Sequence, residues 1–111
     1  FAMRVPVAVG SLTDLTVTTR QDVTVEDVNE VFRNAAEGLR WENFLKYTNQ
    51  PLVSSDIVGE DASCIFDASL TQVVGNQIKV LGWYDNEWGY SNRLADLTAH
   101  VASYLREYSY V

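Results

Sequence analysis

Residues 71–84, TQVVGNQIKVLGWY, give the clearest structural signal in the chain. A glycine-asparagine pair occupies positions 75–76, and both residue types tolerate the positive φ that a two-residue hairpin turn requires. After the turn, residues 77–84 alternate, with Ile78 and Val80 on one face of the expected strand. The stretch therefore predicts an antiparallel hairpin whose second strand has a buried side.

Further strands are predicted upstream of this hairpin. β-Branched residues alternate through residues 9–19, and both faces of that stretch are partly apolar or threonine-rich, which suits a strand with neighbours on both sides. Residues 44–48 and 63–69 are predicted as short strands, and residues 53–58 as another extended piece. The hairpin thus belongs to a larger sheet.

A first helix is predicted over residues 25–39, where apolar residues recur at helical spacing. Thr24 is the expected N-cap, because its hydroxyl can accept a hydrogen bond from a free backbone amide, and Asp27 places negative charge in the first turn. Gly38 marks the expected C-terminal end. We expect this helix to lie on the sheet with its charged side in water.

A second helix is predicted from Glu87 or Gly89 to Glu107, with Asp85 or Asn86 as its cap. Its apolar residues step by four and three, which indicates a continuous seam along one side. The seam consists of Tyr90, Leu94, Leu97, Val101, Tyr104 and Tyr108.

This order of elements predicts an α+β fold, with a mainly antiparallel sheet and helices packed on one face. With 111 residues, the chain is long enough for one small domain with a single core. The dinucleotide-binding unit is absent, because Gly82 and Gly89 do not form a G-x-G-x-x-G loop between a strand and a helix.

The amino-acid composition limits the classes of function that the chain can have. The formal net charge is −7, which disfavours a general nucleic-acid partner. No apolar run approaches the roughly 20 residues that cross a bilayer, so no membrane role is expected. The single cysteine, Cys64, excludes an internal disulfide framework and fits a reducing compartment.

Two segments resemble glyceraldehyde-3-phosphate dehydrogenases. Residues 83–91, WYDNEWGYS, are similar to a signature near the C-terminus of that family, and residues 2–6, AMRVP, are similar to the start of the last third of its catalytic domain. Between them, residues 54–56 and 65–68 match in order and spacing. The resemblance spans essentially all of the chain and implies that residues 1–111 are a C-terminal, partial catalytic domain.

The resemblance also implies a reaction and its partners. The family oxidises glyceraldehyde 3-phosphate with NAD or NADP and inorganic phosphate to 1,3-bisphosphoglycerate. It implies a cytoplasmic enzyme, a homotetramer, and a dinucleotide-binding domain against which this chain packs. NAD versus NADP preference and flux direction leave no mark in these residues.

Three positions carry over from the family's sites. Arg4 matches an arginine of the anion pocket, and a guanidinium fork suits phosphate oxygens; the alternative is a surface arginine paired with a carboxylate. Asn86 matches the asparagine that pairs with the nicotinamide carboxamide, although an asparagine here could simply be a helix cap or a turn residue. Tyr90 matches the tyrosine beside the nicotinamide, and seam packing is its alternative role.

No catalytic residue carries over. The family's Ser-Cys-Thr-Thr-Asn motif is missing, and Cys64 falls inside a predicted strand, where a small core residue is the better interpretation. His100 lies in the terminal helix, where we expect a solvated or interface residue. Asp85 and Glu87 could form an acid/base or metal pair, but capping and first-turn charge explain them better. The chain alone is therefore predicted to be inactive.

Two further expectations concern the chain as a whole. Phe1 and the residues after it lack a turn or cap that would open a domain, which suggests the middle of a longer chain; a free-standing, non-catalytic interaction or assembly module is the alternative. What precedes Phe1 in the gene would distinguish the two. The apolar faces of both helices predict that the chain alone self-associates or is marginally stable.

Overall fold

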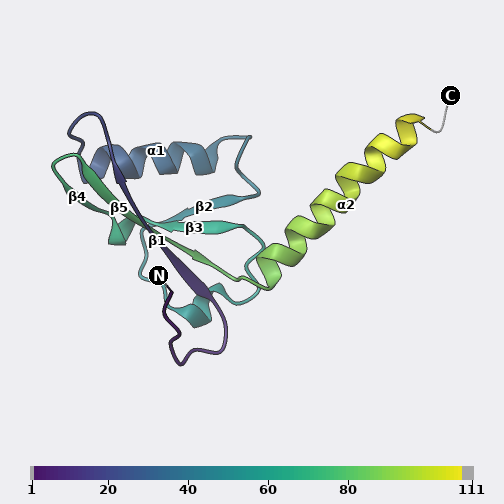
Figure 1. The fold of residues 1–111 in the computed structure, drawn as a ribbon, viewed down its shortest axis with the longest axis horizontal. Coiled ribbons are helices and arrows are strands. Elements are labelled where there is room, and N and C mark those ends of the chain that lie inside the picture. The colour runs from purple at the N-terminus through teal and green to yellow at the C-terminus, as the bar shows by residue number, and fades with distance from the viewer. Residues whose placement is uncertain (1, 109–111) are drawn as a thin grey trace.

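The computed structural model describes the backbone of residues 2–108 and the side chains of residues 2–106. Within these residues, a five-stranded sheet carries one helix on its face, and a second helix projects from the end of the sheet (Figure 1). In chain order the elements are β1 Ser11–Thr18, α1 Val25–Glu37, β2 Leu45–Thr48, the 3₁₀ turn η1 Ser54–Ile57, β3 Cys64–Asp67, the 3₁₀ turn η2 Ala68–Leu70, β4 Gln72–Val74, β5 Gln77–Tyr84 and α2 Trp88–Tyr108.

The sheet is organised around β5. Along its whole length β5 pairs antiparallel with β1, from Ser11 opposite Tyr84 to Thr18 opposite Gln77. On its other side, β4 pairs with the first part of β5 and β3 with the last part, both antiparallel. Only the β2–β3 pair is parallel among the described strands, giving the order β1-β5-β3-β2. The predicted α+β class with a mainly antiparallel sheet is confirmed.

The hairpin that the glycine-asparagine pair predicts joins β4 to β5. Val74 lies opposite Gln77, and Gly75 adopts a φ of +60°, the left-handed region that glycine enters without a Cβ clash. Ile78 and Val80 are buried, as their alternation predicts.

Helix α1 begins at a complete capping box. The Asp27 backbone N–H donates to Thr24 Oγ1 at 3.1 Å, and the Thr24 N–H donates to Asp27 Oδ2 at 2.9 Å. Gly38 is the C-cap, and its N–H donates to the Ala35 carbonyl. Both predicted helix ends are therefore confirmed, because local hydrogen bonding decides them.

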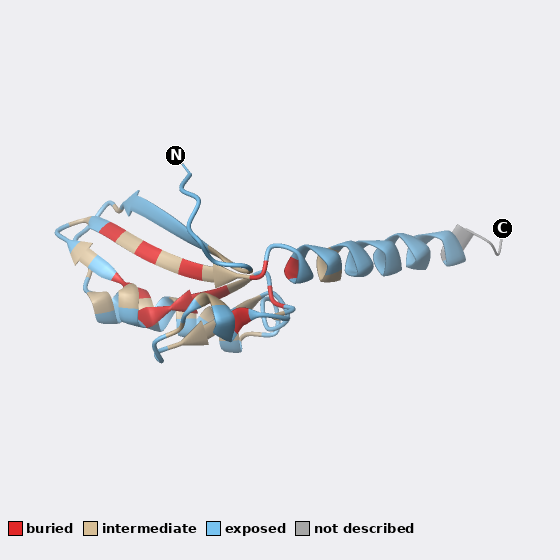
Figure 2. Ribbon diagram, turned by 90° about the horizontal axis from the view of Figure 1, so that it is seen from below, coloured by how far each residue is buried: buried red, intermediate tan, exposed pale blue. Residues whose placement is uncertain are grey.

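The core lies between α1 and the sheet. The rings of Phe32 on α1 and Phe66 on β3 stack with centroids 4.0 Å apart, and Tyr47 on β2 lies 5.8 Å from Phe66. Val28 adds the buried aliphatic contact from α1. Figure 2 shows the buried residues concentrated in the strands of the body. Aromatic stacking and apolar burial together hold α1 on this face.

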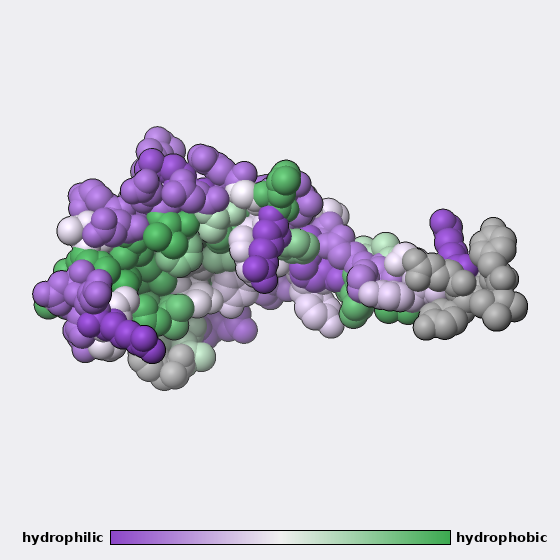
Figure 3. Space-filling model, turned by 90° about the horizontal axis from the view of Figure 1, so that it is seen from above, coloured by the Kyte–Doolittle hydropathy of each residue, from purple (hydrophilic) through white to green (hydrophobic). Residues whose placement is uncertain are grey.

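β1 departs from the prediction that it has neighbours on both sides, because among the described strands it pairs with β5 alone. Leu15 and Val17 lie opposite Val80 and Ile78, on the face that α1 partly covers, yet they remain 49% and 38% exposed. Figure 3 shows hydrophobic surface gathered on the body of the molecule when it is viewed from above. The mixed pattern of β1 therefore reflects a half-covered sheet face.

The prediction of an extended piece at residues 53–58 is wrong. Residues Ser54–Ile57 form the 3₁₀ turn η1, and the Val53 N–H donates to Asp56 Oδ2 at 2.8 Å. A carboxylate that accepts a hydrogen bond from the backbone N–H three residues earlier folds the chain into a turn. The apolar residues at both ends of the stretch hide this turn in the sequence pattern.

Helix α2 has the predicted length, but it does not pack on the sheet face. Figure 1 shows it leaving the end of the sheet, and Figure 2 shows it exposed beyond its first two turns. The predicted seam is therefore solvent-facing from Tyr90 to Tyr104, while the Tyr108 side chain lies outside the described residues. None of the described helices combines the length and apolar character that a bilayer crossing would need.

Candidate functional site at the junction of β5 and α2

Asp85 organises the turn between β5 and α2. Its Oδ1 accepts the N–H groups of Glu87 at 3.1 Å and Trp88 at 3.0 Å, and its Oδ2 accepts the Gly59 N–H at 3.0 Å. These bonds, with that from Trp88 contributing most, lower the pKa of the Asp85 carboxyl below its ordinary value. Asp85 is thus the predicted cap of α2, and it also ties the helix to the loop after η1.

Asn86 is exposed beside this cap. The Ser11 hydroxyl at the start of β1 donates to Asn86 Oδ1 at 3.2 Å. The Asn86 Nδ2 group makes no hydrogen bond among the described residues, so it is free to donate to a ligand oxygen. Capping of α2 falls to Asp85, and Asn86 lies in the turn between β5 and α2, as its turn-residue alternative describes.

Tyr90 lies in the first turn of α2, four residues after Asn86, which lies in the turn that precedes the helix. Its side chain is 68% exposed, so it does not pack against the body. An amide with a free donor and an open aromatic ring therefore both occur within five residues at the start of α2. Together they offer a hydrogen-bond donor and an apolar aromatic surface.

Arg4 lies in the irregular segment that leads to Ser11, and it is exposed. No ion pair or hydrogen bond among the side chains of residues 2–106 involves its guanidinium, so the paired surface arginine is not observed there. Asn86 and Tyr90 thus lie near each other along the chain at the start of α2, and no described contact joins Arg4 to either.

Cys64 and His100 stand apart from this junction. Cys64 lies in β3 beside an apolar cavity of about 530 Å³ between α1 and the following loop, and burial raises the pKa of its thiol. A raised pKa disfavours the thiolate, in agreement with a packing role. His100 is exposed on α2 and contacts the Tyr104 ring edge-on at 5.0 Å. No group of three or more metal-ligating acids, histidines or cysteines was found among the described residues.

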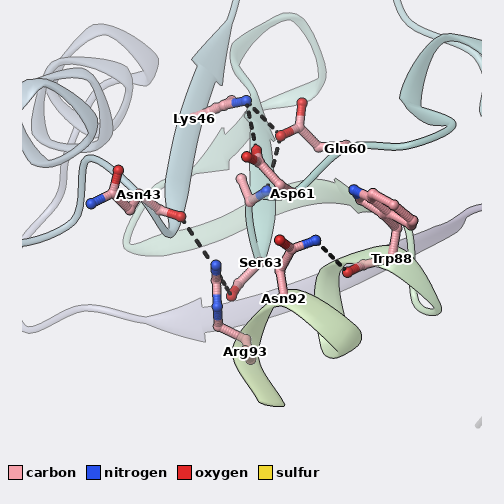
Figure 4. A network of polar contacts seen from close by, with 9 residues as sticks. Asn43, Lys46, Glu60, Asp61, Ser63, Trp88, Asn92 and Arg93 are labelled. Atoms are coloured by element: carbon pink, nitrogen blue, oxygen red, sulfur yellow. Dashed lines mark hydrogen bonds and ion pairs between the residues drawn. The ribbon is translucent and has the colours of Figure 1, made fainter. Parts of the chain in front are cut away.

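Sequence reasoning missed a polar cluster around Arg93. The Arg93 Nη1 donates to the Asn43 carbonyl at 3.2 Å and to Ser63 Oγ at 3.1 Å (Figure 4). Its Nε donates to Asp96 Oδ2 at 2.9 Å. The guanidinium also lies 4.6 Å from the centroid of the Phe44 ring. Only the Arg93–Asp96 spacing is visible in the sequence; the other partners come from loops 30 and 50 residues away.

The cluster borders a polar cavity of about 440 Å³ with an acidic rim. Lys46 closes its far side, where its Nζ pairs with Glu60 at 2.6 Å and Asp61 at 3.2 Å (Figure 4). The hydrogen bonds that Lys46 donates to both carboxylates raise its pKa, with the bond to Glu60 contributing most. The positive charges of Lys46 and Arg93 beside this cavity are therefore already neutralised by neighbouring carboxylates.

Comparison with known proteins places this arrangement in a class. The sequence profile described as "Glyceraldehyde 3-phosphate dehydrogenase, C-terminal domain" matches residues 1–86. The chain is 60% identical over 105 residues to glyceraldehyde-3-phosphate dehydrogenase 2 of Streptomyces arenae, and 55% identical over 105 residues to glyceraldehyde-3-phosphate dehydrogenase of Mycobacterium avium. Each alignment covers 95% of this chain and 31% of the relative.

The class is therefore that of the C-terminal domains of dehydrogenases. The chain belongs to the glyceraldehyde 3-phosphate dehydrogenase C-terminal domain family. It spans about 31% of the length of the curated relatives that it matches.

Proposed function

We propose that residues 1–111 are the C-terminal, partial catalytic domain of a phosphorylating glyceraldehyde-3-phosphate dehydrogenase. The parent enzyme would convert glyceraldehyde 3-phosphate, NAD or NADP and inorganic phosphate to 1,3-bisphosphoglycerate. The observation that carries this proposal is the pair of Asn86 and Tyr90, which the family resemblance assigns to the nicotinamide and which stands open at the start of α2.

Each of the three site residues has a defined role in this proposal. Asn86 would donate from Nδ2 to the carbonyl oxygen of the nicotinamide carboxamide, with its Oδ1 held by Ser11. Tyr90 would form an aromatic wall beside the ring. Arg4 would bind a phosphate group of the substrate or the attacking phosphate, with a guanidinium that stays charged at working pH. The dinucleotide itself would accept the hydride.

The remaining machinery would come from outside these residues. The 111 residues contain no Ser-Cys-Thr-Thr-Asn motif and no G-x-G-x-x-G loop. The nucleophilic cysteine, the histidine base and the dinucleotide-binding domain would therefore be partners of this chain, within a cytoplasmic homotetramer of the glycolytic type. The chain alone would be inactive.

The test joins this chain to the part of the Streptomyces arenae enzyme that precedes its match. We expect turnover from the joined protein and none from the 111 residues alone. Asn86→Ala should raise KM for NAD about tenfold, as expected for loss of one ligand hydrogen bond from a site. Arg4→Met should raise KM for the phosphorylated aldehyde or for phosphate, because a charge-assisted pairing is lost.

A matched control is Arg20→Met, which removes another exposed arginine from a loop far along the chain from the junction. It should leave all three KM values unchanged. A folded, tetrameric joined protein without turnover would overturn the proposal, as would equal effects of Arg4→Met and Arg20→Met.

A further inference from the structure

Helix α2 is attached to the body through one face of its first two turns. Asp85 caps the helix from a buried position, and Gly89 is buried against the loop before β3, where an added Cβ would lie 3.1 Å from the Ala62 carbonyl oxygen. Arg93 is the next residue on that face, since residues four apart in a helix lie one above another. From Leu94 to Arg106, every described side chain is exposed.

Arg93 fixes the direction in which α2 leaves the body. Its three hydrogen bonds reach the loop before β2, the residue before β3 and its own helix, and its planar group lies over Phe44. The side chain is only 27% exposed. A cap alone fixes where a helix begins; a planar group held by acceptors from two separate loops also fixes the direction in which the helix leaves.

The direction of α2 matters because the two residues proposed to face the ligand, Asn86 and Tyr90, are held by different parts of the molecule. Asn86 is tied to the sheet through Ser11 at the start of β1, whereas Tyr90 moves with α2. A change in the angle of α2 would therefore alter the spacing between the Asn86 amide and the Tyr90 ring.

We propose that Arg93 is a positioning residue for the nicotinamide site: it sets the exit angle of α2, and through it the placement of Tyr90 relative to Asn86. This inference rests on the proposed function of the Asn86–Tyr90 pair. Arg93 touches no reacting atom; it acts through the helix that carries Tyr90.

The experiment uses the active joined protein with Arg93→Met, Arg93→Lys and a control, Arg33→Met. Methionine keeps an apolar stem over Phe44 and removes every hydrogen bond, while lysine keeps one charge. Arg33 makes the same kinds of contact from α1, a 3.2 Å hydrogen bond to the Tyr47 hydroxyl and a position 5.1 Å from its ring centroid, but it does not hold α2. Two readouts are taken: hydrogen exchange of the amides at 89–95, and fluorescence titration with NADH beside steady-state kinetics.

Arg93→Met should speed exchange at 89–95 at least tenfold, and it should raise both the NADH Kd and KM for NAD about tenfold while leaving kcat within about twofold, because only cofactor placement is lost. Arg93→Lys should restore part of the affinity, and Arg33→Met should change neither readout. Unchanged NADH affinity in Arg93→Met, or an equal loss in Arg33→Met, would overturn the inference.

Asn86→Ala separates this inference from the proposed function. If Asn86→Ala weakens NADH binding and Arg93→Met does not, the positioning role is wrong and the site stands. If Asn86→Ala leaves NADH binding unchanged, the site itself is wrong, and the positioning role falls with it.

Discussion

At the scale of single residues, Asp85 connects stability to pH. Its folded-state pKa lies below the ordinary value of 3.8, so its contribution to stability is fully present above that value and is lost as the pH falls through the depressed pKa. Asp85→Ala should lower the melting temperature at pH 7 by roughly 5 °C through loss of the cap. The difference between variant and wild type should shrink below pH 3.8. Thermal melts followed by circular dichroism between pH 7 and pH 2.5 measure both effects.

The control for this prediction is Asp22→Ala, which removes an exposed carboxylate that makes no hydrogen bond among residues 2–108. Asp27 and Asp61, whose pKa values are also lowered, remain in both proteins and cancel in the comparison. A difference between Asp85→Ala and wild type that stays constant down to pH 2.5 would show that the carboxylate charge is not what stabilises the turn.

Gly82 matters for packing because it has no side chain. A Cβ added at Gly82 would overlap the Cys64 Sγ across the β3–β5 pair. Gly82→Ala should therefore cost about 1–3 kcal/mol of unfolding free energy, as overpacked cores do. In a Cys64→Ala background the same substitution should cost less than half as much. Urea unfolding of the wild type, the two single variants and the double variant gives a double-mutant cycle. Equal costs of Gly82→Ala in both backgrounds would contradict the contact.

These residues also show what the sequence can and cannot reveal. Thr24, Asp27 and Asp85 were predictable as caps because their partners lie within three residues along the chain. The partners of Arg93 and Gly82 come from distant segments, so no local pattern could indicate them. Asn86, Tyr90 and Arg4 were found through family resemblance, and their ligand roles stay predictions.

At the scale of elements, the two helices differ in what stabilises them. α1 buries Val28 and stacks Phe32 on Phe66, whereas the described contacts between α2 and the body lie in its first two turns. The sequence predicted both helices correctly from apolar spacing, but spacing does not say which face finds a partner. The seam of α2 therefore looked like a packing surface for the sheet, and it is instead exposed.

A truncation tests this difference. A chain that ends after Asp96 keeps the Arg93–Asp96 contact and should lose helical signal while its unfolding free energy changes by less than about 1 kcal/mol. A chain that ends after Tyr84 also loses the Asp85 cap and should be clearly less stable. Urea unfolding monitored by tryptophan fluorescence compares them. A loss of several kcal/mol on truncation after Asp96 would mean that the outer part of α2 supports the fold.

At the scale of the whole molecule, the chain is elongated. Its radius of gyration is 17.1 Å and its extents are 58 × 37 × 26 Å, whereas a compact chain of this length would have a radius of gyration of about 13 Å. The projecting α2 accounts for this shape (Figure 1). Two apolar surfaces stay open as a result: the α2 seam and the β1 side of the sheet, where Leu15 and Val17 lie.

The open seam predicts that the 111-residue chain self-associates through α2. Leu94, Leu97, Val101 and Tyr104 are all about half exposed. Full burial of an exposed apolar side chain contributes about 1.5–3 kcal/mol, so each of these can gain about half of that. Against an association cost of about 4–15 kcal/mol, two copies that bury their seams together should form a weak dimer, with a Kd on the order of 100 µM. Sedimentation velocity across that concentration range should show the shift from monomer to dimer.

Charge placed on the seam should abolish this association, and charge placed opposite it should not. Leu97→Glu with Val101→Lys puts an i,i+4 pair into the seam, while Ala95→Glu with Ala99→Lys puts the same pair on the opposite face of α2. Both pairs should support the helix equally, so any difference in association reports the seam alone. A wild-type chain that stays monomeric at several hundred micromolar with α2 helical would contradict the prediction. Loss of association in both variants would place the contact elsewhere, and the open face of β1 would then be the surface to substitute.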